Sequence, residues 1–283
     1  MGVLPYLLGN ALAWREGAAR RLDVLLWGVL GVVCIMLATY LAGEFWDQRE
    51  DRLSVALGKS RFAGGSGMLQ QAAVAPNTVL AASVLSVALA LCVGTILQYG
   101  YRTGPWTLPL GILGAIGGFF YSSRPLRWVG RGWGELWIGF CYGWLPVAAG
   151  CYLQGGAIPA AVHWLSLPIA LTIFNVILLN EFPDYEADLQ ATKRNLAGRL
   201  GRERAAFLYV LIAALSWMSM SCAARRALST SLIRMYLPVL ILSVGLAGAM
   251  LRGWWRDRRR LEWLCGANLI VNLGTTATLM LNL

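Results

Sequence analysis

The chain has 283 residues, of which 58% are hydrophobic and 13% charged, and its mean hydropathy is +0.58. Soluble domains carry about a quarter charged residues, so this composition excludes an ordinary soluble domain, a disordered chain and a disulfide scaffold, and indicates a membrane protein. The basic residues behind the net charge of +10 lie between apolar runs, which argues against nucleic acid as a partner. The only histidine, His163, lies in a polar break between apolar runs, which argues against histidine triads and histidine metal sites.

Apolar runs of roughly 17 to 25 residues predict an all-α membrane protein, which we interpret as a single domain over residues 1–283. The first run, Val3–Trp14, is too short for a straight crossing. We interpret it as a shortened first helix rather than a signal peptide, because no basic residue precedes it and no cleavage site follows it. Eight clear spans follow, at Val24–Gly43, Ala73–Tyr99, Pro105–Tyr121, Leu136–Leu153, Leu165–Asn180, Ala205–Cys222, Tyr236–Leu251 and Leu261–Leu281.

Lysine and arginine are concentrated in alternate connections between these spans. The richer connections are 49–61, 124–131, 193–204 and 252–260. Because basic loops face the cytoplasm, we expect a multi-pass protein of the inner (cytoplasmic) membrane, surrounded by membrane lipids, with these connections on the cytoplasmic side.

One acidic motif, Glu-Phe-x-Asp-x-x-x-Asp, occurs twice, at Glu44–Asp51 and at Glu181–Asp188. More than half of the 14 acidic residues lie in these two stretches. Each copy directly follows an apolar span and the copies are four spans apart, so both should face the same side of the membrane. The repeat suggests two pseudo-repeated halves, about 1–134 and 135–283.

Each copy contains two aspartates four residues apart, Asp47 with Asp51 and Asp184 with Asp188. On a helix this spacing places both carboxylates on one face, where they repel each other. The pair becomes favourable when Mg²⁺ lies between the carboxylates and the oxygens of a phosphorylated ligand. Anchoring of helix ends is the alternative, but it does not require a repeated motif. Pro183 is expected to break the second helix and begin a new one.

Basic and glycine-rich segments follow each copy, at Lys59–Gly67 and Lys193–Gly201, and a third connection on the same side is Tyr121–Arg127. Lysine and arginine bind phosphate oxygens, and glycine backbone can approach them closely. Membrane topology alone explains about half of these basic residues. The candidates for binding phosphate are Lys59, Arg61, Tyr121, Arg124, Arg127, Lys193 and Arg194.

These residues resemble the UbiA superfamily of intramembrane prenyltransferases over nearly the whole chain. The matching motifs are the two Asp motifs, the Tyr121–Arg127 loop with Gly134-Glu135 beyond it, and the Lys193–Gly201 tail. The resemblance implies about nine transmembrane helices around a central cavity, in which Mg²⁺ and a prenyl diphosphate lie under a cytoplasmic cap. It implies a catalytic, metal-binding role for Asp47, Asp51, Asp184 and Asp188, with Glu44 and Glu181 as further metal-side carboxylates and Asn180 beside the diphosphate.

Departures from the family pattern leave the acceptor open. Gly43-Glu44 stands where the first motif usually begins Asn-Asp, and Thr192 and Asn195 differ from the usual tail. Transfer of the prenyl group to an aromatic or other lipophilic acceptor is the favoured activity, and acceptor-free cyclisation by a UbiA-type terpene cyclase is the alternative. An ion-coupled transporter is disfavoured, because carrier carboxylates usually lie near the bilayer midplane and these lie at helix ends.

Overall fold

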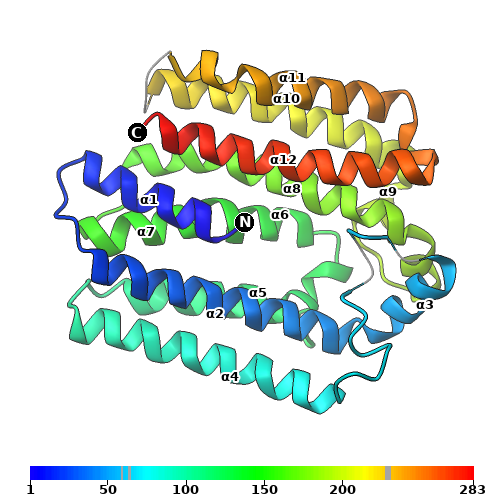
Figure 1. Ribbon diagram of the computed structural model, residues 1–283, viewed down its shortest axis with the longest axis horizontal. Helices are drawn as coiled ribbons and strands as arrows, with labels where there is room; N and C mark the ends of the chain where they lie inside the picture. Colours follow the sequence, from blue (N-terminus) through cyan, green and yellow to red (C-terminus); the bar gives the residue numbers. More distant parts are fainter. Residues whose placement is uncertain (59, 63–64, 227–230) are drawn as a thin grey trace.

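The computed structural model describes residues 1–58, 60–62, 65–226 and 231–283, and every regular element in these residues is helical (Figure 1). The α-helices are α1 (Val3–Arg15), α2 (Leu22–Trp46), α3 (Gln48–Gly58), α4 (Pro76–Thr95), α5 (Thr107–Ser122), α6 (Gly134–Gly139), α7 (Leu145–Gly155), α8 (Ala160–Gln190), α9 (Leu196–Leu200), α10 (Arg202–Arg226), α11 (Ser231–Leu251) and α12 (Arg258–Leu281). A π turn, Ile96–Gly100, extends α4, and another, Phe140–Trp144, joins α6 to α7. Short 3₁₀ turns lie at Trp128–Gly130 and Trp254–Arg256.

The helix ends follow local signals in the sequence. Pro76 begins α4, where its missing N–H costs no helical hydrogen bond. Gly156 follows α7 with a φ of 73°, a left-handed conformation that glycine adopts without a steric penalty. The Asp257 side chain accepts a hydrogen bond of 2.9 Å from the backbone N–H of Arg260 and so caps α12.

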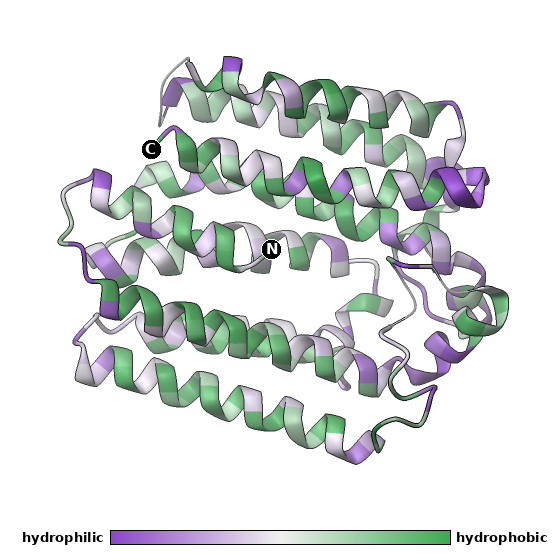
Figure 2. Cartoon of the chain, viewed as in Figure 1, coloured by the Kyte–Doolittle hydropathy of each residue, from purple (hydrophilic) through white to green (hydrophobic). Residues whose placement is uncertain are grey.

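Within the described ranges, seven helical segments are long and apolar enough to cross a membrane. They are Leu22–Trp46, Pro76–Gly100, Gly134–Gly155, Ala160–Gln190, Arg202–Arg226, Ser231–Leu251 and Arg258–Leu281. α5 is a shorter apolar helix, and α1 has only 13 residues. Figure 2 shows hydrophobic residues along the middle of the long helices and hydrophilic residues gathered near α3. The predicted all-α membrane fold is therefore confirmed, with two of the expected spans shorter than the rest.

The long helices lie side by side along a common direction (Figure 1). α2 packs against α4 and α5, α8 packs against α10 and α12, and α1 packs against α7. α3 and α9 follow the two acidic stretches, and both lie at the same end of the bundle (Figure 1). The fold therefore brings the two copies of the motif to one end.

The helix break predicted at Pro183 is wrong, because α8 continues through Pro183 to Gln190. A proline removes the N–H that would bond to the carbonyl four residues earlier, here that of Leu179. In the structure this carbonyl accepts a hydrogen bond from the thiol of Cys265, on α12, with a sulfur–oxygen distance of 3.8 Å. A partner from a neighbouring helix thus replaces the missing hydrogen bond, and Asp184 and Asp188 lie on successive turns of one continuous helix.

Candidate active site

The first acidic stretch spans the junction of two helices. Asp47 follows the last residue of α2, and its N–H donates to the carbonyl of Gly43 at 2.9 Å. α3 begins at Gln48, yet the N–H of Asp51 donates to the carbonyl of Asp47 at 2.9 Å. The predicted spacing of one turn between the aspartates is preserved, while the chain changes direction so that α3 packs against α8.

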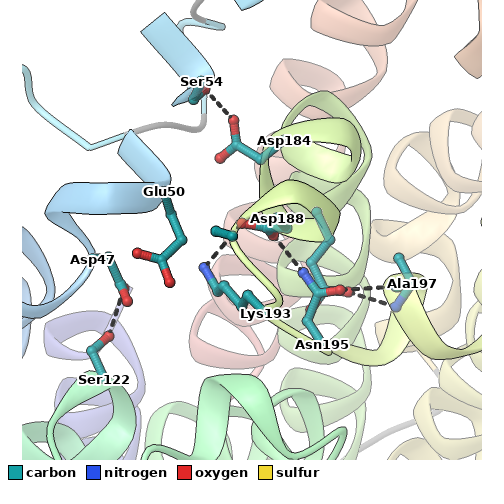
Figure 3. Close-up of polar contacts among 12 residues, drawn as sticks. Asp47, Glu50, Ser54, Ser122, Asp184, Asp188, Lys193, Asn195 and Ala197 are labelled. Atoms are coloured by element: carbon teal, nitrogen blue, oxygen red, sulfur yellow. Dashed lines mark hydrogen bonds and ion pairs between the residues drawn. The ribbon is translucent and has the colours of Figure 1, made fainter. Parts of the chain in front are cut away.

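Asp47 is held by side chains from the Tyr121–Arg127 segment, of which Figure 3 shows Ser122. The hydroxyl of Ser122 donates to Asp47 Oδ2 at 2.9 Å, and the guanidinium of Arg127 lies 3.4 Å from Asp47 Oδ1. Arg127 also forms a short ion pair with Glu50, whose side chain is buried. The Tyr121–Arg127 segment, which was predicted from the sequence to bind phosphate, therefore contacts the first acidic stretch directly.

Asp184 and Asp188 have partners of different kinds. The hydroxyl of Ser54, on α3, donates to Asp184 Oδ1 at 2.6 Å and so connects the two acidic stretches (Figure 3). Asp188 is buried, and its Oδ2 accepts a hydrogen bond of 2.7 Å from the amide of Asn195. The ammonium of Lys193 lies 3.5 Å from Asp188 Oδ1.

The Lys193 ammonium points into the space between the two acidic stretches (Figure 3). Burial by itself lowers the pKa of Lys193, but the carboxylates of Asp47, Asp188 and Glu50 outweigh burial and raise that pKa. Arg127 behaves in the same way, because Glu50 and Asp47 outweigh the effect of burial and raise its pKa. Both residues therefore remain cations at neutral pH, which suits them to bind phosphate oxygens.

Asp51 shows that the carboxylates at this end are crowded. Burial, followed by the neighbouring charges of Asp47 and Glu44, raises the pKa of Asp51 to about 7. The opposing influence of Lys193 does not cancel these effects. A further cation between the two acidic stretches would relieve this repulsion.

The donor atoms at this end suit Mg²⁺, which prefers oxygen ligands. Within the described part of the chain, no group of three or more His, Cys, Asp and Glu side chains could hold a metal by itself. Mg²⁺ commonly binds one or two carboxylates together with substrate phosphates, so an incomplete protein cage is the expected arrangement. The four aspartates contribute oxygen donors from both acidic stretches at one end of the bundle, so their chemistry fits this metal.

Glu44 and Glu181 hold backbone segments. Glu44 Oε1 accepts a hydrogen bond of 2.5 Å from the N–H of Ser66, and Glu181 Oε2 accepts one of 2.9 Å from the N–H of Ala197. These contacts anchor the segments that follow each acidic stretch.

The remaining predicted residues differ in how close they lie to the acidic groups. Tyr121 and Asn180 are partly buried on α5 and α8, one turn before Arg124 and Asp184 in sequence. The side chains of Arg61, Arg124 and Arg194 are exposed, and no hydrogen bond links them to an aspartate. Lys59 lies outside the described residues.

Three polar residues that donate hydrogen bonds to the aspartates were not among the predicted site residues: Ser54, Ser122 and Asn195. Glu50 was not among them either, and it reaches the site through its ion pair with Arg127. Ser122 and Asn195 lie inside the two basic segments Tyr121–Arg127 and Lys193–Gly201, which were predicted to bind phosphate, and Glu50 lies inside the first acidic motif. Ser54 carries no signal in the sequence, because its role depends on how α3 crosses to α8.

An apolar cavity of about 110 Å³ lies among α1, α2, α4, α5 and the segment from Cys141 to Leu153. Thr39 and Gly118 line it, and they are two turns from Asp47 and one turn from Ser122 along their helices. Many of the lining residues are glycines: Gly2, Gly28, Gly31, Gly94, Gly111, Gly114 and Gly118. The bundle therefore contains apolar space near the polar end.

Comparison with known proteins relates this arrangement to a family. A sequence model described as the UbiA prenyltransferase family matches residues 2–270. A 1,4-dihydroxy-2-naphthoate octaprenyltransferase from Bacillus subtilis is 28% identical over 208 residues, which is 72% of this chain and 63% of the relative. The chain thus matches less than two thirds of that relative's length.

Solved structures share the fold at low sequence identity. An apo UbiA homologue from Aeropyrum pernix has a TM-score of 0.75 and 16% identity, with 99% of this chain and 96% of that chain covered. A UbiA homologue from Archaeoglobus fulgidus bound to GPP and Mg²⁺ has a TM-score of 0.67 and 15% identity, with 98% and 95% covered. These structures show that the helix arrangement is common to them and to this chain.

Proposed function

The chain belongs to the UbiA prenyltransferase family, and on that basis we propose that it ionises a prenyl diphosphate with Mg²⁺ and transfers the prenyl group to an aromatic acceptor. One observation carries the proposal: Lys193 lies between two carboxylate-bearing segments that meet at one end of an apolar bundle. This combination suits a ligand with a strongly anionic head and an apolar tail. Neither a transport pathway nor helix anchoring requires it.

Lys193 and Arg127 bind the diphosphate oxygens in this proposal. Each is a cation that stays charged among carboxylates, and each lies at the end of the bundle where the aspartates meet. Charge develops on the leaving pyrophosphate as its C–O bond breaks, so fixed cations stabilise the transition state more than the ground state. The exposed Arg61, Arg124 and Arg194, together with Asn180 and Tyr121, would contact the diphosphate from the rim.

The residues that would hold Mg²⁺ are Asp47, Asp51, Asp184 and Asp188. When bound, the metal supplies Lewis-acid stabilisation of the departing pyrophosphate. Ser122, Ser54 and Asn195 each donate a hydrogen bond to one of these carboxylates and so fix its orientation before the ligand arrives. Lys193 limits repulsion among the carboxylates while the metal is absent.

The prenyl tail would occupy the apolar interior. The glycine-lined cavity begins near Thr39 and Gly118, one to two helical turns from Ser122 and Asp47. An apolar environment keeps water away from the allylic cation, and the face of Tyr142, which lines the cavity, can stabilise that cation. In this proposal the inner membrane supplies such lipophilic substrates, and the basic connections support a site that faces the cytoplasm.

The acceptor in this proposal is an electron-rich aromatic ring, with 1,4-dihydroxy-2-naphthoate as the first compound to test. The support is the likeness to naphthoate octaprenyltransferases. The test incubates purified protein with Mg²⁺ and prenyl diphosphates from geranyl to octaprenyl, with and without the naphthoate, and measures products and pyrophosphate.

A prenylated naphthoate that requires the acceptor and is lost in EDTA would support the proposal. A cyclic terpene formed without acceptor would instead identify a terpene cyclase. Absence of pyrophosphate release with every substrate would refute both activities.

A further inference from the structure

The segment that carries Lys193 and Asn195 is not part of a long helix. α8 ends at Gln190, Thr192 has a φ of 61°, and α9, the next helix, contains only five residues. The N–H of Lys193 donates to the carbonyl of Asp188 at 2.8 Å, which begins the turn. Because this short segment supplies two partners of Asp188, something beyond its own helical structure must fix its position.

Two buried acids from different helices bind this segment. Glu135, on α6, is 1% exposed, and its Oε1 accepts a hydrogen bond of 3.1 Å from the N–H of Leu196. Glu181, on α8, is 7% exposed, and its Oε2 accepts the N–H of Ala197 at 2.9 Å. The other oxygens of the two carboxyl groups, Glu135 Oε2 and Glu181 Oε1, are buried without a hydrogen-bond partner among the described residues, and Glu135 acts electrostatically on Glu181. Two consecutive backbone N–H groups are thus held from two sides.

Asn195 connects these N–H groups to Asp188 in the candidate active site. Asn195 precedes them and caps α9, because its Oδ1 accepts the N–H of Gly198 at 2.9 Å. Its amide nitrogen donates to Asp188 Oδ2 at 2.7 Å. A shift of the backbone at Leu196 and Ala197 would therefore move both Asn195 and Lys193 relative to Asp188.

Burial of two acids costs free energy, which their hydrogen bonds to backbone N–H groups partly offset. Apolar side chains would pack between α6 and α8 but would leave the N–H groups of Leu196 and Ala197 without acceptors. The other copy of the acidic motif supplies independent support. Glu44 occupies the position equivalent to Glu181, and it too accepts a backbone N–H, that of Ser66, from the segment that follows its motif.

We propose that Glu135 and Glu181 are positioning residues that hold the Lys193–Ala197 segment, so that Lys193 and Asn195 are fixed against Asp188 for binding of the prenyl diphosphate. The role in substrate binding rests on the function proposed above. For Glu181, this assigns a structural target, the backbone N–H of Ala197, in place of a metal.

Trypsin provides a test that needs no turnover, because the segment contains Lys193 and Arg194, and Arg199 lies just after it. In Glu135→Leu the acceptor for Leu196 is lost, so cleavage in this segment should be about tenfold faster, as expected for local opening after loss of a buried hydrogen bond. Glu135→Gln keeps an acceptor oxygen and adds an amide donor for Glu181, so its cleavage should match that of the unmodified protein. Glu186→Gln is the matched control, because Glu186 is an exposed acid on α8, the helix of Glu181, and pairs with Arg202 instead of the segment.

Kinetics then separate positioning from simple loss of stability. Glu135→Leu should raise the KM for the prenyl diphosphate about tenfold, with a smaller change in kcat, and Glu135→Gln should restore the KM. If Glu135→Leu does not fold, Glu135→Asp retains the charge and shortens the side chain by one methylene. Glu135→Asp should then be cleaved faster than the unmodified protein, whereas Glu135→Gln should be cleaved at the unmodified rate.

Unchanged cleavage in both Glu135→Leu and Glu135→Asp would overturn the proposal. So would unchanged KM despite faster cleavage. Because cleavage is measured without substrate, failure of the proposed enzymatic activity would not alter that result.

Discussion

Replacement of Lys193 by methionine tests the charge arrangement most directly. Methionine has a similar length and is apolar, so the change removes the cation while much of the packing is retained. Lys193 is 13% exposed and lies 3.5 Å from Asp188 Oδ1, with Asp47 and Glu50 nearby. We expect a large loss of kcat/KM for the prenyl diphosphate and a less stable metal-free protein.

The size of the loss follows from the ion pair. Two unit charges 3.5 Å apart attract by about 5 kcal/mol at an effective dielectric constant of 20. A diphosphate oxygen at the same distance from Lys193 would be attracted as strongly, but this is a gross value, because both charges lose solvation when the ligand binds. A hydrogen bond to a charged group contributes about 1.5 to 3 kcal/mol net, which corresponds to roughly a 10- to 150-fold fall in kcat/KM. Stability should fall by about 3 kcal/mol, as when one partner of a buried ion pair is removed.

Initial rates of pyrophosphate release across a range of prenyl diphosphate concentrations measure the first effect, and thermal unfolding in detergent with EDTA measures the second. Lys193→Arg keeps the charge in a different shape and should fall between the two proteins. Arg204→Gln is the control, because Arg204 is an exposed cation in the same connection. A kcat/KM within twofold of the unmodified value in Lys193→Met would refute the assignment of Lys193 to the diphosphate.

Three other predictions follow from the same contacts. Asp184→Asn keeps an acceptor for Ser54 but loses the charge, so turnover should fall at least about 100-fold with an unchanged melting temperature. The pKa of Asp51 is about 7 in the folded chain and 3.8 ordinarily, so the folded state holds more protons between these values. The stability of the metal-free protein should therefore fall as pH rises from 5 to 7, and Asp51→Asn should make the melting temperature depend less on pH in this range. Cys265→Ala should lower the free energy of unfolding by about 1 kcal/mol, because the Leu179 carbonyl loses its partner. The loss should be smaller in a Pro183→Ala background, where the N–H of residue 183 can bond to that carbonyl. Equal losses in both backgrounds would contradict the hydrogen bond between Cys265 and Leu179.

The positions of most helices could be predicted from the sequence because a bilayer imposes a length and an apolar composition on each crossing. The exception at Pro183 shows where this reasoning stops. The sequence shows that proline lacks the N–H for one helical hydrogen bond. Whether the helix continues depends on whether another group in the fold donates to the freed carbonyl. Here that partner is Cys265, on a helix far away in sequence, and no local pattern identifies it.

The site also combines residues that local sequence predicts with residues whose roles depend on tertiary contacts. The aspartates were predictable because they repeat with fixed spacing, and Lys193 because it follows the second copy directly. Their partners Glu50, Ser54 and Ser122 acquire roles only when α3 and the Tyr121–Arg127 loop come together in the fold. Single polar residues on such connections are common, so their contribution becomes visible only with the tertiary contacts.

The repeat itself gives the strongest link between sequence and site, because equivalent residues of the two copies have equivalent contacts. The glutamate that opens each motif accepts a backbone N–H from the following segment, from Ser66 in one copy and from Ala197 in the other. The first aspartate of each motif accepts a serine hydroxyl, from Ser122 or from Ser54. This order separates two roles within one motif: the glutamates hold the backbone that follows each copy, and the aspartates remain available for the metal role proposed above. A glutamate is one methylene longer than an aspartate, and that extra reach suits the first role, so Glu44 in place of the usual aspartate is compatible with the proposed function.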